Sequence, residues 1–337
     1  MCHLIYTDTF YMKRKWIRWV SWILLTPIIL FVILMVLLYV PPVQNLLRRE
    51  VTAYASKATG MQIQVERIDL RFPLNLLVRG VEVIQQPDTL LSLESLNVRV
   101  QAWPLIKGKV EVDEVTLSRV AVNSANLMEG MTIKGVFGRF FLQSHGVDLS
   151  NELAVINQVE LSDTHVQLLM NDTTTTPKDT TASAPINWKV ALHQLKLKNV
   201  SFSMQLPADS MRMAAHIGEA AIDDAQADLK NQYYDLKKFL LSGTSASYDT
   251  GTAQPAEGFD ASHIAVRDIR IALDSLLYKG RDMNAVIREF TMNERSGLSV
   301  TSLTGRAYSN DSVICVPGLK LNTPHSEIDL SAHTYWE

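Results

Sequence analysis

The chain has 337 residues, a formal net charge of −3, and 47% hydrophobic residues. Without an excess of basic residues it lacks the electrostatic footprint of a nucleic-acid-binding protein, so no nucleic-acid partner is expected. Its two cysteines, Cys2 and Cys315, are too few for a disulfide scaffold, and the fold must therefore be held by its apolar residues.

The first element is an uncharged apolar run over residues 19–40. At about 1.5 Å per residue it spans about 33 Å, enough to cross a hydrocarbon core of about 30 Å. No small-residue cleavage site follows it, so we expect an uncleaved, single-pass transmembrane anchor at 19–40. The positive-inside rule then predicts that residues 1–18 are a cytoplasmic N-terminus and that the bulk of the chain lies on the other side. Four cations precede the run: Lys13, Arg14, Lys15 and Arg18.

The second element is a short amphipathic helix, predicted over residues 41–60. Pro41 and Pro42 end the membrane run, and Gly60 stands where a C′ glycine ends a helix. Two arrangements are open: the apolar stripe of this helix could pack on the domain, or the helix could cap one end of a sheet. We favour the cap. The apolar residues recur at steps of three and four: Val43, Leu46, Leu47, Val51, Tyr54 and Ala58.

From Met61 onward the helical period is replaced by a repeated strand pattern: two alternating apolar residues, two polar spacers, then two more alternating apolar residues. Alternation predicts a strand with one apolar and one wet face. The doubled spacer predicts a β-bulge that bends the strand and keeps both apolar pairs on one side; the alternative is two short strands that face opposite ways. The apolar positions in the clearest copies are Ile63, Val65, Ile68, Leu70, Leu93, Leu96, Val98, Val110, Val112, Val115, Leu117, Val190, Leu192, Leu195, Leu197, Ile264, Val266, Ile269 and Ile271.

Short polar turns separate these strands, which predicts antiparallel hairpins and meanders. Residues 172–185 are low in complexity and poor in apolar residues, so we expect a disordered loop there. Residues 243–258 form a weaker loop of the same kind. Residues 229–241 fit either a helix or a strand, and we favour the strand.

No nucleotide-binding loop, nucleophile elbow or zinc-binding helix motif occurs in the sequence. His165 lies near Asp163, but this pair alone is more typical of a solvated strand than of a site. We therefore expect no catalytic residues, no metal and no cofactor, and do not expect an enzyme.

Several segments resemble the AsmA-like family, which includes TamB. The resemblance begins at Ala58-Thr59-Gly60, continues through Ile63–Leu70 and 90–122, and returns near the C-terminal end. The late segments are Glu294-Arg295-Ser296-Gly297-Leu298 and Thr323-Pro324-His325-Ser326.

This resemblance implies a mainly β fold: a long, curved antiparallel sheet forming an open trough (a β-taco of the repeating β-groove type) over residues 61–337, behind the anchor and capping helix. It also implies an inner-membrane protein of outer-membrane biogenesis whose bulk is periplasmic. The repeated apolar positions would line the trough and carry phospholipid between the membranes. About eighteen strands spaced by about 4.8 Å would give a trough about 85 Å long.

Family members are longer than this chain, so we expect a protein truncated at its C-terminus. A partner barrel of the TamA or BamA type is accordingly expected only for a full-length form. Two other functions stay open: an assembly scaffold whose sheet edge pairs with unfolded outer-membrane strands, and a membrane-tethered, closed β-sandwich sensor domain.

Overall fold

The computed structural model describes residues 40–72, 74–85, 87–101, 103–104, 111–124, 130–148, 151–170 and 187–335. Most of the expected membrane anchor and the whole of the loop expected at 172–185 lie outside these residues. Within the described ranges, no helix combines the length and the hydropathy needed to cross a membrane.

One helix and a long series of strands make up the described chain. Helix α2 spans Pro41–Thr59, and the short 3-10 helix η1 spans Pro207–Asp209. The strands are β1 (Gln62–Arg71), β2 (Asn75–Gln85), β3 (Asp88–Val100), β4 (Val112–Asn123), β5 (Met131–Asp148), β6 (Leu153–Met170), β7 (Lys189–Leu206), β8 (Met211–Asp228), β9 (Tyr233–Asp249), β10 (His263–Lys279), β11 (Asp282–Glu294), β12 (Ser299–Val300), β13 (Ser302–Ser309), β14 (Val313–Asn322) and β15 (Glu327–Tyr335).

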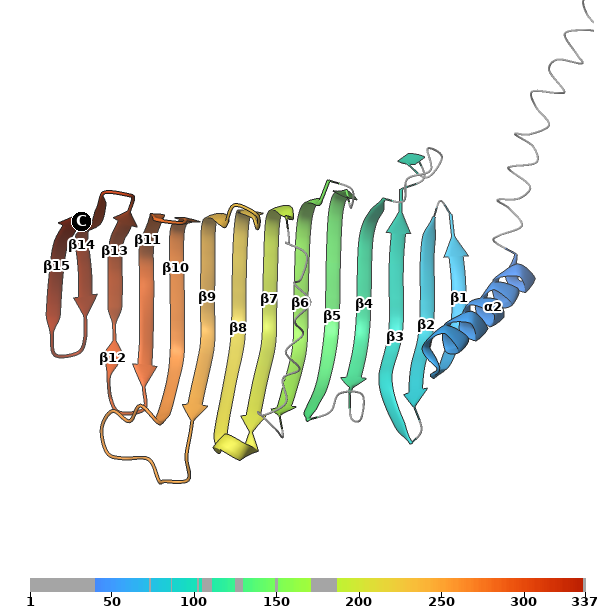
Figure 1. The fold of residues 1–337 in the computed structure, drawn as a ribbon, viewed down its shortest axis with the longest axis horizontal. Helices are drawn as coiled ribbons and strands as arrows, with labels where there is room; N and C mark the ends of the chain where they lie inside the picture. Colours follow the sequence, from blue (N-terminus) through green and yellow to red (C-terminus); the bar gives the residue numbers. More distant parts are fainter. Residues whose placement is uncertain are drawn as a thin grey trace, which may run out of the picture.

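These strands form a single 15-stranded sheet that runs in sequence order from β1 at one end to β15 at the other (Figure 1). The short strand β12 lies off this path: it pairs only with β11, and β11 also pairs directly with β13. The mainly β fold predicted from the alternation is confirmed, and so is the long open sheet that the family resemblance implies. The strand number is lower than expected, however. At about 4.8 Å per strand, the path from β1 to β15 is about 60 Å long rather than about 85 Å.

One pair departs from the predicted antiparallel order, because β6 and β7 run parallel. Every other pair in the described sheet is antiparallel. A parallel pair needs a connection long enough to return along the strand. In the described sheet, only β6 and β7 are separated by so long a low-complexity segment, which lies between Met170 and Lys189. Sequence reasoning identified that segment but missed its consequence for the topology.

Helix α2 lies beside β1 at the end of the sheet (Figure 1). The predicted C′ glycine is confirmed: Gly60 has φ 70° and donates its N–H to the Ser56 carbonyl. Three polar side chains on one side of the helix bind the free edge of β1. Gln44 donates to the Leu70 carbonyl, Arg48 donates to the Glu66 carbonyl, and the Ser56 hydroxyl bonds the Ile63 N–H at 3.1 Å.

The favoured position of this helix, at one end of the sheet, is confirmed (Figure 1). The alternative, in which its apolar stripe packs on the domain, is wrong for part of the stripe. Leu46, Val51 and Tyr54 are 58%, 50% and 77% exposed. A strand edge presents unpaired N–H and C=O groups, so the helix face with hydrogen-bonding side chains binds it better than an apolar face does.

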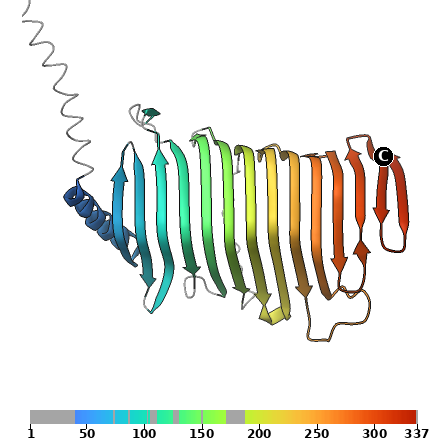
Figure 2. The ribbon, with the colours of Figure 1, turned by 180° about the vertical axis from the view of Figure 1, so that it is seen from behind.

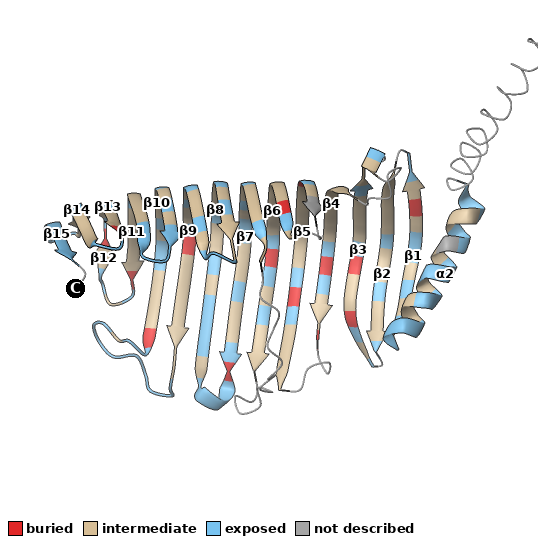
Figure 3. Cartoon of the chain, turned by 45° about the horizontal axis from the view of Figure 1, so that its top comes forward, coloured by how far each residue is buried: buried red, intermediate tan, exposed pale blue. Residues whose placement is uncertain are grey.

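Across the described residues the sheet is a single layer. Viewed from behind, the same row of strands is visible with no second sheet packed on it (Figure 2). Buried residues are few and scattered along the strands (Figure 3), and no side chain of the described chain is less than 2% exposed. The closed β-sandwich considered from the sequence is therefore not the architecture of this region.

The segment from 229 to 258 combines a correct and a wrong prediction. Tyr233–Asp249 is strand β9, as favoured for its first part. The weaker loop predicted from 243 is wrong up to Asp249, and irregular structure begins at Thr250. The small residues that suggested a loop instead occupy the middle of a sheet, where neighbouring strands supply their backbone partners.

Candidate functional site: an apolar face

A continuous row of apolar residues crosses the sheet from its first strand to its last. Leu70 on β1 pairs with Leu76, and successive cross-strand neighbours continue the row with Gly305 as its only residue without an apolar side chain. The row is Leu70, Leu76, Val98, Val115, Leu142, Val159, Leu195, Ile222, Phe239, Leu273, Ile287, Gly305, Leu319 and Leu330. Since paired residues lie on the same face, these side chains form one apolar band.

A second row runs beside the first, from β1 to β11. It is likewise wholly apolar, and Ala220 within it is buried. Its members are Ile68, Val78, Leu96, Leu117, Phe140, Leu161, Leu197, Ala220, Leu241, Ile271 and Phe290.

Between this row and the next, the strands bend along a line that we call the crease. From β1 to β8, the pairing register skips one residue on each strand at this line, for example Glu66 and Gly80 between the pairs Val65–Val81 and Arg67–Arg79. From β8 to β10 the skipped segments are longer and include Gly218, Gly243 and Asp268. The crease residues are Glu66, Gly80, Glu94, Arg119, Gly138, Asp163, Asn199, Gly218, Gly243 and Asp268.

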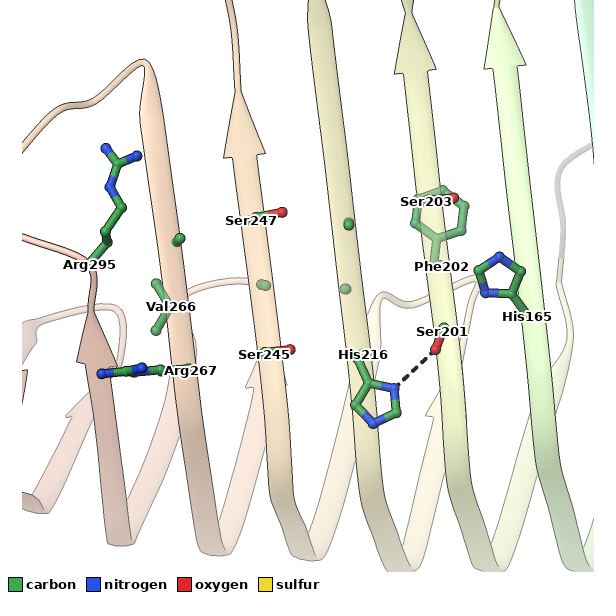
Figure 4. A pocket seen from close by; sticks show the side chains of 14 residues that line it. His165, Ser201, Phe202, Ser203, His216, Ser245, Ser247, Val266, Arg267 and Arg295 are labelled. Atoms are coloured by element: carbon green, nitrogen blue, oxygen red, sulfur yellow. Dashed lines mark hydrogen bonds between the residues drawn. The ribbon is translucent and has the colours of Figure 1, made fainter. Parts of the chain in front are cut away.

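Six of these crease residues have φ between 45° and 58°. Glycine, asparagine and aspartate enter this left-handed region most easily, and they account for five of the six. The exception is Arg119, whose guanidinium pairs with the Glu94 carboxylate on the next strand. Figure 4 shows the neighbouring strands turning sharply at this line.

Beyond the crease two further rows begin, one starting at Val65 and the other at Ile63, and they are apolar except for Thr164 and Gly135. The first row is Val65, Val81, Leu93, Val120, Phe137, Thr164, Val200 and Ile217. The second row is Ile63, Val83, Leu91, Val122, Gly135, Val166, Phe202, Ala215, Ala246 and Val266.

The crease is what keeps all four rows on one side. On β10 both spacers, Arg267 and Asp268, are exposed, whereas Val266 and Ile269 on either side of them are partly buried. Residues beside the crease on the apolar side include the most buried ones, such as Thr164 at 2% exposure. The apolar side is therefore the concave side of the bend, which we call the apolar face.

The remaining predicted positions lie at the margins of these rows. Val190 pairs with Ala154 and Ala227; Leu192 pairs with Ile156 and Ala225. Ile264 pairs with Tyr248 and Ile269 with Thr244. Val112 pairs with Val100, and its carbonyl accepts a hydrogen bond from the Ser144 hydroxyl at 2.6 Å. Val110 lies outside the described residues.

Sequence reasoning missed the apolar residues of β2 and β5 that complete the rows. Leu76, Val78, Val81 and Val83 obey the same spacing, with Arg79 and Gly80 as spacers. On β5, Phe137, Phe140 and Leu142 obey it with Gly138 and Arg139 as spacers. A search that accepted glycine in the doubled spacer would have found β2, and β5 also needs glycine to be accepted at one apolar position, Gly135.

An apolar hollow of about 220 Å³ lies on this face near its C-terminal end. Small residues on β11 and β13, Ala285 and Ala307, leave room between the larger side chains of Leu276, Tyr278 and Met283. The last three are 38–44% exposed. Such a hollow lined by carbon atoms accommodates a hydrocarbon segment.

One acidic side chain near the apolar face, Glu294, accepts hydrogen bonds from backbone N–H groups. Glu294 pairs with Val266 at the end of one apolar row and is buried. Its pKa is lowered, chiefly by a hydrogen bond from the Ser296 side chain and then by the Ser296 N–H, which lies 2.6 Å from a carboxylate oxygen. The Glu294 carboxylate therefore has hydrogen-bond partners at the end of the apolar row, and it does not interrupt that row.

No group of three or more His, Cys, Asp or Glu side chains in the described ranges is arranged to hold a metal ion. His165 and Asp163 do not bond one another; the Asp163 carboxylate accepts from Asn199 and the His165 ring contacts Gln167.

Comparison with protein-family models and with curated proteins finds no match to this chain.

Proposed function

We propose that this protein carries phospholipid along its apolar face. The observation that supports this most strongly is the row from Leu70 to Leu330, which runs the whole length of the described sheet with no polar side chain and no second layer over it. An ordinary domain buries such a face, because apolar surface exposed to water is unfavourable.

The energetics favour a conduit over a single pocket. A chain of about 15 methylene groups costs about 12 kcal/mol to expose to water, at about 0.8 kcal/mol per group. Half a bilayer core is about 15 Å thick, so one acyl chain would cover a fraction of a face about 60 Å long. A lipid could thus move along the face without leaving apolar contact.

The location belongs to the same proposal. Residues 19–40 would anchor the chain in the inner membrane of a Gram-negative bacterium, with the sheet in the periplasm, as the resemblance to AsmA-like and TamB proteins implies. A barrel partner of the TamA or BamA type would belong only to a longer form of the protein.

Site-specific photocrosslinking tests the proposal. A benzoylphenylalanine placed at Leu195, in the middle of the longest row, should crosslink to phospholipid in cells. The matched position is Lys196, its exposed neighbour on the opposite side of the same strand. Equal crosslinking at both positions, or none at Leu195, would contradict lipid carriage on the apolar face.

A second function, strand assembly, is favoured by one observation. Every residue of β15 is exposed, and in the described chain β15 pairs on one side only, with β14. An edge of this kind can accept an added strand. Crosslinks from Asp329 to an unfolded outer-membrane protein, with none to lipid at Leu195, would favour this function over the first.

A further inference from the structure

A hollow of about 560 Å³ lies on the other side of the sheet, over β6 to β11 (Figure 4). Four of its residues form one cross-strand row: His165, Ser201, His216 and Ser245. Each is the sequence neighbour of a residue at or beside the apolar rows, such as Phe202 beside Ser201. Alternation therefore places these four side chains, and most of the hollow, on the polar face. Four residues of the apolar row that starts at Ile63 also contribute to the lining: Phe202, Ala215, Ala246 and Val266.

Small residues make the hollow. The next row along the strands is Ser203, Ala214, Ser247 and Ala265, and all four line the hollow. These short side chains form a low floor between taller residues. The hollow is thus built into the β7–β10 sequences, including the serines of β9 that the sequence analysis assigned to a loop.

The surroundings of the floor are rich in hydrogen-bond donors. Two imidazoles, four serine hydroxyls and the guanidinium groups of Arg267 and Arg295 line the hollow, and none of the described lining residues is acidic. The Ser201 hydroxyl and His216 Nδ1 are 3.0 Å apart. Arg295 is held in place by donating from Nη2 to the His263 carbonyl at 2.7 Å.

Two carboxylates lie close by and leave this donor set largely free. Asp268 is 4.0 Å from the Arg267 guanidinium, but both side chains are more than 70% exposed, so the pair is weak. Glu294 accepts hydrogen bonds from the Ser296 and Ala265 N–H groups, which occupy its oxygens.

We propose that this hollow binds a small molecule bearing a phosphate group. Guanidinium, imidazole N–H and hydroxyl groups all donate to phosphate oxygens, and arginine does so with two parallel bonds. The volume falls in the range of small-molecule sites, about 300–1,000 Å³. The same chemistry fits a free phosphate ester or a phospholipid headgroup. This inference does not depend on lipid carriage by the apolar face.

Equilibrium dialysis of the full chain in maltoside micelles, with radiolabelled inorganic phosphate, measures this binding directly. Two competitors distinguish the source of the ligand: sn-glycerol 3-phosphate represents free esters, and dihexanoylphosphatidylglycerol represents a headgroup. Either pattern of competition supports the phosphate site. Absence of phosphate binding together with absence of binding by both competitors would overturn it.

Three variants locate the site. Arg267→Gln should weaken phosphate binding at least tenfold. Arg270→Gln removes the same charge from the same strand, at an exposed residue outside the hollow, and should change binding less than twofold. Ala214→Phe leaves the charge unchanged. Ala214 is exposed, and the larger side chain should fill the floor of the hollow and abolish binding. If Arg267→Gln and Arg270→Gln weaken binding equally, only net charge matters and the proposal is wrong.

Discussion

At the scale of single residues, the bend of the sheet depends on what stands at the crease. Aspartate, asparagine and glycine reach a positive φ there, and glycine also permits close approach of the neighbouring strand. At Gly138, an added Cβ would lie 2.7 Å from the Asp163 Cβ and 3.0 Å from the Asp163 carbonyl oxygen. Both distances are shorter than normal packing allows.

Gly138→Ala should therefore destabilise the protein by about 1–3 kcal/mol, the usual range for forced overpacking. Gly318→Ala is the matched control, because an added Cβ at Gly318 has no atom within 4 Å. Urea unfolding of both variants measures the difference. Equal stability of the two variants would show that the strands do not approach closely at the crease.

A single carboxylate orders the connection between β9 and β10. The pKa of Asp260 is lowered to about 2, chiefly by the N–H groups of Ala256 and Ser262 and then by the His263 ring. Because the folded pKa lies below the usual value of about 3.9, the stabilisation is complete above pH 4 and is lost as the pH falls toward 2.

Asp260→Asn should remove this dependence. In the native protein, hydrogen exchange of peptides containing Ala256 and Ser262 should rise relative to the sheet between pH 4 and pH 2. In the variant, these peptides should exchange faster already at pH 7 and show no added change in the acid range. An unchanged profile in the variant would exclude Asp260 as the cause.

At the scale of elements, α2 closes one edge of the sheet through side chains rather than through backbone pairing. The Ser56 hydroxyl bonds the Ile63 N–H, which would otherwise be an unpaired edge donor. Ser56→Ala should weaken helix docking by about 1 kcal/mol, the typical net value of one hydrogen bond. Faster hydrogen exchange in α2 and β1 is the readout, and exposed Asn45→Ala, on the same helix, should leave it unchanged.

The elements also show what the sequence could and could not reveal. The doubled spacers at Glu66-Arg67 and Arg267-Asp268 predicted a bend that keeps both apolar pairs on one side, and the burial of their flanking residues agrees. The parallel pairing of β7 with β6 could not be read from alternation, because alternation carries no information on strand direction. The outward-facing Leu46 and Tyr54 were missed because periodicity identifies a stripe but not the surface that covers it.

Only part of the apolar face could be predicted from the sequence, because the pattern was recognised on some strands and not on others. Repeats with charged spacers identified Leu195 and Ile271, whereas the glycines in the spacers of β2 and β5 concealed Val81 and Phe140. The polar hollow was not foreseen, because it arises from serines and alanines on separate strands that only the register brings together.

At the scale of the whole molecule, the described sheet is long and bent, and no second layer from the described residues packs on it. Its apolar residues lie in rows rather than in a closed core. A charge in the middle of the longest row should interrupt that surface at little cost in stability, because the row is only partly buried. Leu195→Asp should therefore lower lipid crosslinking in cells severalfold, while Lys196→Asp on the polar face should not. Equal crosslinking in the two variants would contradict a continuous lipid path.

The most direct test of lipid carriage is native mass spectrometry of residues 41–337, expressed without the apolar run that precedes them. A face about 60 Å long has room for several acyl chains side by side, so the protein should retain more than one phospholipid after purification, and Leu195→Asp should retain fewer. A folded protein that retains no phospholipid would contradict the account.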